Sequence, residues 1–336
     1  MASNGHEIID TLIIGGGPAG HAAAVSIARN VHTAVLFDSH EYRNGHANHM
    51  HMIPTWDGRD PEDFREAARK NTGERYPLIS FVDAKITKAK RLEDETFEIE
   101  DGEGKTWRGK SLVLATGVED VLVDPPGLDE CWGKSIYHCL FCFGYENRGS
   151  SSSGILWFDD DFQLGFVQHM ARNGAQLSDA VTIYTNGSTK RAESFAAATV
   201  ENEPFKVDSR RIAKFELGPT GSGVLITFED GSTRAEGFLA HKPIMKLRNT
   251  YLAEQLGLET TPTGDIKVIP PFGETSVPGC FAAGDNSSTF KMISNAIHAG
   301  ALAASGVASH VQSRLYGQKG MSDVLRAAAA AKEQQK

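Results

Sequence analysis

The glycine-rich turn at residues 15–20 (GGGPAG) constrains the fold of this chain more than any other feature. It follows an apolar, β-branched run and precedes a helical stretch, so Gly15, Gly17 and Gly20 fit the G-x-G-x-x-G pattern in its strand–turn–helix setting. The first glycine permits a tight turn, the second lets the backbone approach a pyrophosphate, and the third lets helix and strand pack closely. The turn therefore predicts a Rossmann-type fold with a dinucleotide at the helix N-terminus.

An acidic residue follows the glycine turn at the distance that binding of ribose hydroxyls requires. The predicted strand 33–37 leads into Asp38, which lies 38 − 15 = 23 residues after the first glycine, close to the ~20 expected. A further buried strand, 111–117, ends in small residues where a backbone can approach a cofactor. The expected cofactor-binding residues in this half of the chain are Gly15, Gly17, Pro18, Ala19, Gly20, Asp38, Ala115, Thr116 and Gly117.

Composition narrows the class of protein. A length of 336 residues suggests about two domains, and the 40% hydrophobic and 23% charged residues are ordinary for a soluble protein. The net charge of −9 and the lack of a basic run argue against nucleic acid or an anionic membrane as a partner. No apolar run reaches the ~18 residues of a membrane span. The polar segment 1–7 does not resemble a signal peptide, so we expect a cytoplasmic protein.

Two cysteines, Cys139 and Cys142, lie two residues apart and form a candidate redox pair. Such a pair closes a small disulfide and reopens it readily, because the spacing often lowers the pKa of one thiol. The alternative is that the two cysteines bind zinc. A four-ligand zinc site needs a second cysteine pair or nearby histidines, and no second CxxC exists in the sequence. We expect Cys131 and Cys280 to be structural.

The segment 44–52 (NGHANHMHM) places three histidines within six residues. Metal binding is one interpretation, but Met and Asn fill the spaces and no acidic partner is evident nearby. We therefore predict no metal site and a loop that lies over the cofactor. The segment 59–70 then predicts an exposed amphipathic helix, with Asp60 as its N-cap and Pro61 at its first position.

Several motifs together resemble a known family. The glycine turn, the strand end 115–117, the CxxC pair and a late Gly284-Asp285 are similar to the low-molecular-weight thioredoxin reductase family of flavoproteins. A closer resemblance is to the gliotoxin oxidase-like, FAD-dependent dithiol oxidases of fungal epidithiodiketopiperazine pathways. It runs from about residue 8 to about residue 308, and its motifs are HMH at 49–51, YHCLFC at 137–142, VTIYTNG at 181–187 and ETSVPG at 274–279.

This resemblance implies an α/β, two-domain flavoprotein with Rossmann-type nucleotide-binding folds, bound FAD and a homodimer. A central domain, 119–245, would be inserted between the two halves of the FAD-binding domain, 1–118 and 246–336. Gly284 and Asp285 would then lie beside the ribityl chain and pyrophosphate. A helix beginning at Met292 and Ile293 would face the flavin ring, where its amides would stabilise negative charge on reduced flavin.

The central domain lacks the signals of a second dinucleotide site. After the predicted strand 154–158 the sequence is DDDFQLG, with no G-x-G-x-x-G or G-x-G-x-x-A pattern. Its three carboxylates would repel phosphates, since two unit charges at about 4 Å repel by about 1 kcal/mol even in water. The next strand, 180–184, is followed by TNG rather than the arginine cluster usual in the reductases, and Lys190 and Arg191 read as a solvated helix start. We therefore predict that NADPH does not bind.

The predicted activity follows from these assignments. A small-molecule dithiol, in the resemblance a diketopiperazine, would be oxidised to its disulfide through Cys139 and Cys142, with O2 as acceptor and H2O2 as product. Relatives usually carry Asp or His directly after the second cysteine, whereas this chain has Phe143, which could line an apolar substrate pocket. His138 and His298 are the remaining catalytic candidates, although each could equally be a packed or surface histidine.

Two other functions stay open. One is an NADPH-dependent disulfide reductase. The other is a flavoprotein that binds a thiol metabolite without turning it over, and Phe143 is the reason to consider it.

Overall fold

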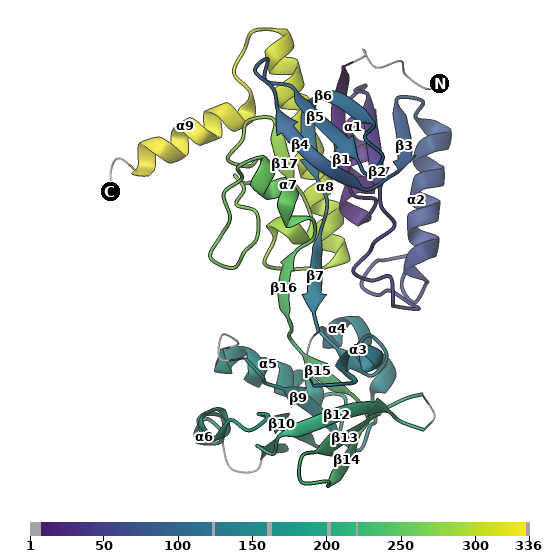
Figure 1. Ribbon diagram of the computed structural model, residues 1–336, viewed down its shortest axis with the longest axis vertical. Helices are drawn as coiled ribbons and strands as arrows, with labels where there is room; N and C mark the ends of the chain where they lie inside the picture. The colour runs from purple at the N-terminus through teal and green to yellow at the C-terminus, as the bar shows by residue number, and fades with distance from the viewer. Residues whose placement is uncertain (1–7, 123–124, 160–162, 200–202, 220, 334–336) are drawn as a thin grey trace. The chain divides into compact units, whose positions relative to one another are not determined.

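The computed structural model describes residues 8–122, 125–159, 163–199, 203–219 and 221–333 (Figure 1). The described residues form two compact units. The first is built from Met1–Gly45, Arg59–Glu119 and Met245–Lys336, and the second from His46–Gly58 and Asp120–Ile244. The histidine segment therefore belongs to the second unit, whereas the sequence placed it in the first half of the flavin domain.

The first unit contains a seven-stranded sheet of order β3-β2-β1-β6-β5-β4, with β17 beside β6. The strands β1, β2, β3, β6 and β17 run parallel, and β4 and β5 are antiparallel additions. This is the Rossmann-type arrangement that the glycine turn predicts. The strands are β1 (Ile9–Ile14), β2 (Ala34–Asp38), β3 (Ile79–Asp83), β4 (Ile86–Arg91), β5 (Phe97–Asp101), β6 (Thr106–Leu114) and β17 (Cys280–Ala282).

Successive side chains of a strand point to opposite faces of the sheet. Both faces of this sheet carry buried apolar side chains. Leu12 and Phe37 belong to a core on one face, and Ile13 and Leu36 belong to a core on the other. Burying a side chain of this size stabilises the fold by about 1.5–3 kcal/mol relative to leaving it exposed. The second face is covered by α1 and α8, which pack against each other.

The helices of the first unit begin where the local sequence signals them. The side chain of Asp60 caps α2 by accepting a hydrogen bond from the Glu62 amide at 2.7 Å, and Pro61 occupies the first position, as predicted. No helix among the described residues is long and apolar enough to cross a membrane. The helical segments are α1 (Pro18–Arg29), α2 (Pro61–Arg75), α7 (Thr250–Gln255), the 3-10 turn η2 (Asp285–Ser287), α8 (Ile293–Leu315) and α9 (Met321–Glu333).

The second unit contains a five-stranded parallel sheet of order β11-β10-β9-β15-β8 and a three-stranded antiparallel sheet of order β12-β13-β14. The chain passes between the units within a two-stranded pair, β7 and β16. The strands are β7 (Val118–Val121), β8 (Ile136–Tyr137), β9 (Ser153–Leu156), β10 (Val181–Tyr184), β11 (Phe205–Asp208), β12 (Ile212–Leu217), β13 (Val224–Phe228), β14 (Thr233–Glu236), β15 (Leu239–His241) and β16 (Ile244–Leu247). Its helical segments are α3 (Leu128–Cys131), α4 (Leu140–Phe143), η1 (Tyr145–Asn147), α5 (Leu164–Ala175) and α6 (Thr189–Ala197).

Two stretches are placed by contacts that local sequence does not signal. The apolar run 81–86 is divided between β3, which pairs in parallel with β2, and β4, which is antiparallel to β5. The serine-rich run 150–153 is held by hydrogen bonds. Ser153 begins β9 with its hydroxyl 2.7 Å from that of Ser178, and Ser150 donates to the Asn147 carbonyl.

The contact between α1 and α8 depends on Gly300. A Cβ at this position would lie 2.1 Å from the Ala19 carbonyl oxygen, which is backbone and cannot turn aside. Gly300→Ala should therefore lower the free energy of unfolding by about 1–3 kcal/mol through overpacking, measured by urea denaturation.

Gly165 provides the matched control, because it is an exposed helical glycine whose added Cβ meets nothing within 4 Å. Gly165→Ala should be neutral or stabilise by about 0.5–1 kcal/mol. Equal destabilisation by both changes would contradict the packing explanation.

Candidate redox and cofactor site

The three glycines of the N-terminal turn meet different surroundings. A Cβ on Gly15 would lie 2.3 Å from the Ala115 carbonyl oxygen, and a Cβ on Gly20 would lie 1.9 Å from the Gly15 carbonyl oxygen. These two glycines are needed for packing of strand, turn and helix. A Cβ on Gly17 would meet nothing within 4 Å, so the backbone there borders open space at the N-terminus of α1. A phosphate group can approach this position.

Asp38 ends β2 with its carboxylate held in a fixed position. It is 5% exposed and accepts hydrogen bonds from the Tyr42 hydroxyl at 2.5 Å and the His40 amide at 2.9 Å. A Cβ on Gly16 would lie 1.9 Å from its Oδ2 atom, so Gly16 is required as well, which the spacing pattern did not indicate. Burial and the adjacent carboxylate raise the pKa of Tyr42, which therefore stays a hydrogen-bond donor.

The C-terminal part of the first unit holds the second predicted motif. Gly284 has a φ of +95°, in the region that favours glycine, and it directs the chain into the turn that carries Asp285. The Asp285 carboxylate forms an ion pair with Arg43 at 3.1 Å, and Lys291 donates to the Asp285 carbonyl at 2.7 Å. Arg43 was missed, because no local pattern connects residues that are 242 positions apart. Lys291 was missed as well, because its ion pair with Asp265 is formed only by the fold.

Asn286 is a further residue that the sequence did not single out. It is fully buried, and its amide nitrogen donates to the Leu114 carbonyl at 2.8 Å and to the Thr116 hydroxyl at 3.3 Å. Its Oδ1 atom has no hydrogen-bond partner among the described residues. A buried acceptor without a donor costs free energy, so a ligand N–H or O–H at this position would satisfy it. Together with the open backbone at Gly17, this fits a dinucleotide cofactor.

The helix predicted to start at Met292 and Ile293 is α8. Met292 is its extended N-cap and Ile293 its first residue. His298 lies further along α8 with an exposed side chain, so within one chain it faces solvent. The structure does not place His298 in the same unit as the cysteine pair.

Cys139 and Cys142 form a disulfide in the second unit, with their Cα atoms 5.3 Å apart. Cys139 is the N-cap of α4, and its sulfur accepts a hydrogen bond from the Cys142 amide at 3.1 Å. A donor at this sulfur would favour its thiolate form once the disulfide opens. The other two cysteines are inert by comparison, because burial raises the pKa of Cys131 to about 11 and that of Cys280 to about 12.

Aromatic rings surround the disulfide segment. The Phe143 ring stacks on Tyr137 at 5.3 Å and makes edge contacts with His138 and His49, each at 6.0 Å. His138 also contacts Trp132 at 6.0 Å. Phe143 is thus half-buried against the core of the second unit, and both His138 and Phe143 lie beside the redox pair.

The chain is similar to known proteins over most of its length. The family model described as pyridine nucleotide-disulphide oxidoreductase matches residues 9–142. Thioredoxin reductase tcpT of Claviceps purpurea is 44% identical over 314 residues, which cover 93% of this chain and 97% of that protein. The chain belongs to the thioredoxin reductase family. Thioredoxin reductase aclD of Aspergillus oryzae is 41% identical, with 90% of this chain and 96% of that protein covered.

Solved structures agree with this family and its fold. The putative thioredoxin reductase TrxB from Bacillus anthracis matches with a TM-score of 0.81 and 26% identity, covering 91% of this chain and 99% of that chain. The structure of HlmI matches with a TM-score of 0.80 and 26% identity, covering 98% and 99%. The predicted resemblance to thioredoxin reductase-like flavoproteins of fungi and the predicted fold class are therefore confirmed, and the protein is an oxidoreductase.

An open α/β sheet binds ligands at the carboxyl ends of its strands, where the strand order reverses. In the second unit that place lies between β9 and β15. The ring of His241, at the end of β15, contacts Phe158 at 5.3 Å and Trp132 at 6.2 Å. Its Nδ1 atom lies 3.4 Å from the Leu156 carbonyl oxygen. Asp160 and Asp161, part of the predicted acidic run, lie outside the described residues.

Arg191 differs from its expected role as a solvated helix start. Its guanidinium folds back and donates to the Thr185 carbonyl at 3.2 Å, at the end of β10. Arg210 is paired with Asp208 on β11.

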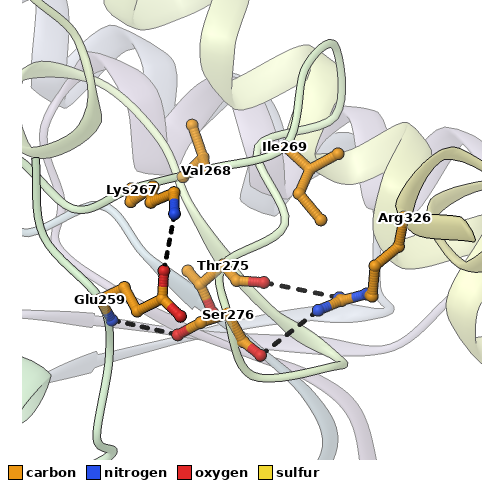
Figure 2. A pocket seen from close by; sticks show the side chains of 7 residues that line it. All are labelled: Glu259, Lys267, Val268, Ile269, Thr275, Ser276 and Arg326. Carbon is orange, nitrogen blue, oxygen red and sulfur yellow. Dashed lines mark hydrogen bonds and ion pairs between the residues drawn. The ribbon is translucent and has the colours of Figure 1, made fainter. Parts of the chain in front are cut away.

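A pocket of about 190 Å³ lies elsewhere in the first unit (Figure 2). Its charged side chains are paired within the chain. Lys267 donates to Glu259 at 2.8 Å, and Arg326 donates to the carbonyls of Ser276 and Thr275 at 3.3 and 3.5 Å. None of the predicted site residues lines this pocket, so we assign it no part in the chemistry.

The burial of His241 at the end of β15 can be tested through the pH dependence of stability. Burial lowers its pKa to about 4, although the Leu156 carbonyl, Asp120 and Asp159 act in the opposite direction. The unfolded state therefore binds a proton at higher pH than the folded state, and stability falls as pH drops from about 6.5 towards 4. The shift corresponds to roughly 3 kcal/mol. His241→Phe should remove this part of the pH dependence, measured by urea unfolding followed by tryptophan fluorescence.

His169, an exposed histidine of the same unit, supplies the control. His169→Gln should leave the pH dependence unchanged. A His241→Phe protein that loses stability with falling pH as steeply as the parent would show that His241 is not buried as a neutral ring.

Proposed function

We propose that this protein is a flavin-dependent oxidase that converts a small-molecule dithiol to its disulfide through Cys139 and Cys142. FAD is its cofactor and O2 its electron acceptor, so H2O2 is the second product. The observation that carries the proposal is that the glycine turn of a dinucleotide site is present after β1 and missing from the sequence after β9. The rings of Trp132 and Phe158, each in contact with that of His241 at the end of β15, support it further. A chain of this kind would keep a flavin site and a redox disulfide without the phosphate-binding turn of a nicotinamide site.

The residues that would hold FAD are those whose surroundings fit a dinucleotide. The open backbone at Gly17 would receive the pyrophosphate at the N-terminus of α1. Asp38 would accept the ribose hydroxyls, and Asp285 and Asn286 would bind the middle of the cofactor. When bound, FAD would accept two electrons from the cysteine dithiol and pass them to O2, which takes up two protons to give H2O2.

The thiol chemistry needs only the cysteine pair and the substrate. A substrate thiolate attacks the sulfur of Cys139, a new S–S bond forms, and the sulfur of Cys142 leaves as a thiolate. The second substrate thiolate then attacks the substrate sulfur of this mixed disulfide and releases Cys139. The substrate leaves as a disulfide, having lost two electrons and two protons, and the cysteine pair is reduced. The amide of Cys142 stabilises the released Cys139 thiolate, which is ready to reform the original bond.

Proton transfer falls to a neighbouring group, because Phe143 cannot exchange a proton. His138 precedes Cys139 directly, and its ring contacts those of Phe143 and Trp132. A neutral imidazole in this position can accept the proton of an attacking thiol. The ring of Phe143 offers an apolar surface beside the disulfide, which suits a hydrophobic cyclic dipeptide such as a diketopiperazine dithiol. The implied homodimer, in which a second copy would approach the exposed His298, belongs to the same proposal.

The direction of electron flow is the main point of difference from a reductase. Three features support entry of electrons from a thiol: the missing glycine pattern after β9, the rings at the carboxyl ends of β9 and β15, and the Arg191 side chain already bonded to Thr185. Each removes a contact that a bound NADPH would need.

Aerobic turnover of a reduced diketopiperazine dithiol tests the oxidase. The product should be lighter by two hydrogens, with one H2O2 released per disulfide formed, followed by mass spectrometry and a peroxidase-coupled assay. Cys142→Ser should abolish peroxide release, because the disulfide can no longer form.

Cys131→Ala is the matched control, since it removes a buried thiol outside the pair and should keep most of the turnover. A product lighter by two hydrogens without peroxide would contradict O2 as the acceptor. Binding of the dithiol without any product would favour a non-catalytic metabolite-binding flavoprotein.

Anaerobic mixing with NADPH separates the oxidase from a reductase. The flavin absorbance should stay unchanged over minutes, because the glycine turn that would bind NADPH is missing after β9, and should bleach on addition of a dithiol. Rapid bleaching by NADPH would reverse the assigned direction. The measurement is a stopped-flow absorbance trace, with a dithiol as the positive control in the same preparation.

A further inference from the structure

The histidine segment His46–Gly58 brings together side chains that the proposed oxidase chemistry does not use. The rings of His49 and His51 lie 5.1 Å apart, while Met50 between them is 3% exposed. Glu146, on η1, faces the same two rings. The candidate ligand atoms of His49, His51 and Glu146 all lie within 4.8 Å of one another. The acidic partner that the local sequence lacks is thus supplied 95 residues away from His51.

His51 is oriented by a carboxylate on its other side. Its Nδ1 atom lies 3.2 Å from Oδ2 of Asp57, and Oδ1 of Asp57 accepts the Met52 amide at 2.8 Å. The Nε2 atom consequently faces Glu146, with an N–O distance of 3.3 Å. Nε2 is buried and has no hydrogen-bond partner among the described residues. A histidine held by a carboxylate at one ring nitrogen, with the other nitrogen free of hydrogen bonds, has the arrangement of a metal ligand with its supporting carboxylate.

The backbone of the histidine segment is held in an unusual conformation. Met52 and Thr55 have φ values of +66° and +71°, which non-glycine residues rarely adopt. The Gly58 amide donates to the Met50 carbonyl at 2.8 Å and closes the loop, and the Asp57 carboxylate holds Met52 in its unusual conformation. Backbone strain of this kind costs of order 1–3 kcal/mol per residue and persists where the surroundings impose it.

We propose that His49, His51 and Glu146 form a binding site for a divalent transition metal of the Zn2+ class, with Asp57 supporting His51. Two imidazoles and one carboxylate are a ligand set of zinc sites that keep an open fourth position. Metal–ligand distances of about 2.0–2.2 Å place tetrahedral ligand atoms about 3.4 Å apart. The widest separation in the cluster, at most 4.8 Å, therefore has to close by up to about 1.4 Å, and the exposed side chain of Glu146 is able to turn.

The site adjoins the redox segment but does not use its sulfurs. The His49 ring contacts Phe143, which follows Cys142, so a bound metal would link the histidine segment to α4 and η1. Cys139 and Cys142 are joined in a disulfide, and Cys131 and Cys280 are fully buried, so none of the four thiols is available as a ligand in the oxidised protein. The proposed metal site therefore uses none of the groups that carry the thiol chemistry, and it can be tested without an assay of oxidase activity.

The experiment titrates Zn2+ into the oxidised holoprotein, purified without a polyhistidine tag, in competition with a chromophoric chelator. The expected result is one equivalent of Zn2+ per chain. X-ray absorption at the zinc edge should show nitrogen and oxygen ligands and no sulfur. His51→Ala and Glu146→Gln should each weaken binding at least about tenfold, and Asp57→Asn should weaken it by about 10–100-fold, as supporting residues do.

His46→Ala is the matched control, because His46 is an exposed histidine of the same segment outside the cluster, and its binding should equal that of the parent. Glu146→Gln changes an exposed side chain, so its weakened binding is informative even if His51→Ala fails to fold. Substoichiometric Zn2+ in the parent, equal loss of binding in His46→Ala, or sulfur in the absorption spectrum would each overturn the proposal.

Discussion

The first unit depends on the close approach of backbone to backbone around α1. Gly20 lets the helix rest on the Gly15 carbonyl, Gly15 lets the turn rest on Ala115 at the end of β6, and Gly300 lets α8 rest on Ala19. At each contact the nearest atom is a main-chain oxygen, so no rotamer change could make room for a methyl group. The same contacts fix the N-terminus of α1, where a phosphate is bound in this type of fold. Packing and cofactor recognition are therefore set by one group of glycines.

Local signals account for the parts of this arrangement that the sequence predicted. The turn at 15–20, the acid at Asp38 and the cap at Asp60 each lie within a few residues of the element that they define. Arg43, Asn286 and Lys291 escaped prediction, because their partners are brought to them only by the fold. Similarly, β3 and β4 could not be separated from hydrophobicity alone, because the division depends on which neighbouring strand each one pairs with. The partnership of Glu146 with His51 was out of reach for the same reason.

The two sheets differ at the carboxyl ends of their strands. In the first unit, the backbone at Gly17, shortly after β1, borders open space. In the second, Phe158 follows β9, and its ring contacts that of His241 at the end of β15, whose burial lowers its pKa to about 4. Main-chain amides can bind a phosphate, whereas aromatic rings supply packing surface.

The assembly of the first unit from three separated segments also has a consequence for folding during synthesis. One face of its sheet is covered by α8, whose Ala303, Ala304 and Val307 are fully buried against strands made more than 180 residues earlier. The second unit, by contrast, is complete once Ile244 has been made. At that point in synthesis the second unit can be complete, while one apolar face of the sheet in the first unit is not yet covered by α8. Domains generally fold as units, and exposed apolar surface promotes aggregation. The last stretch of translation is thus the period in which this protein most depends on protection of that surface.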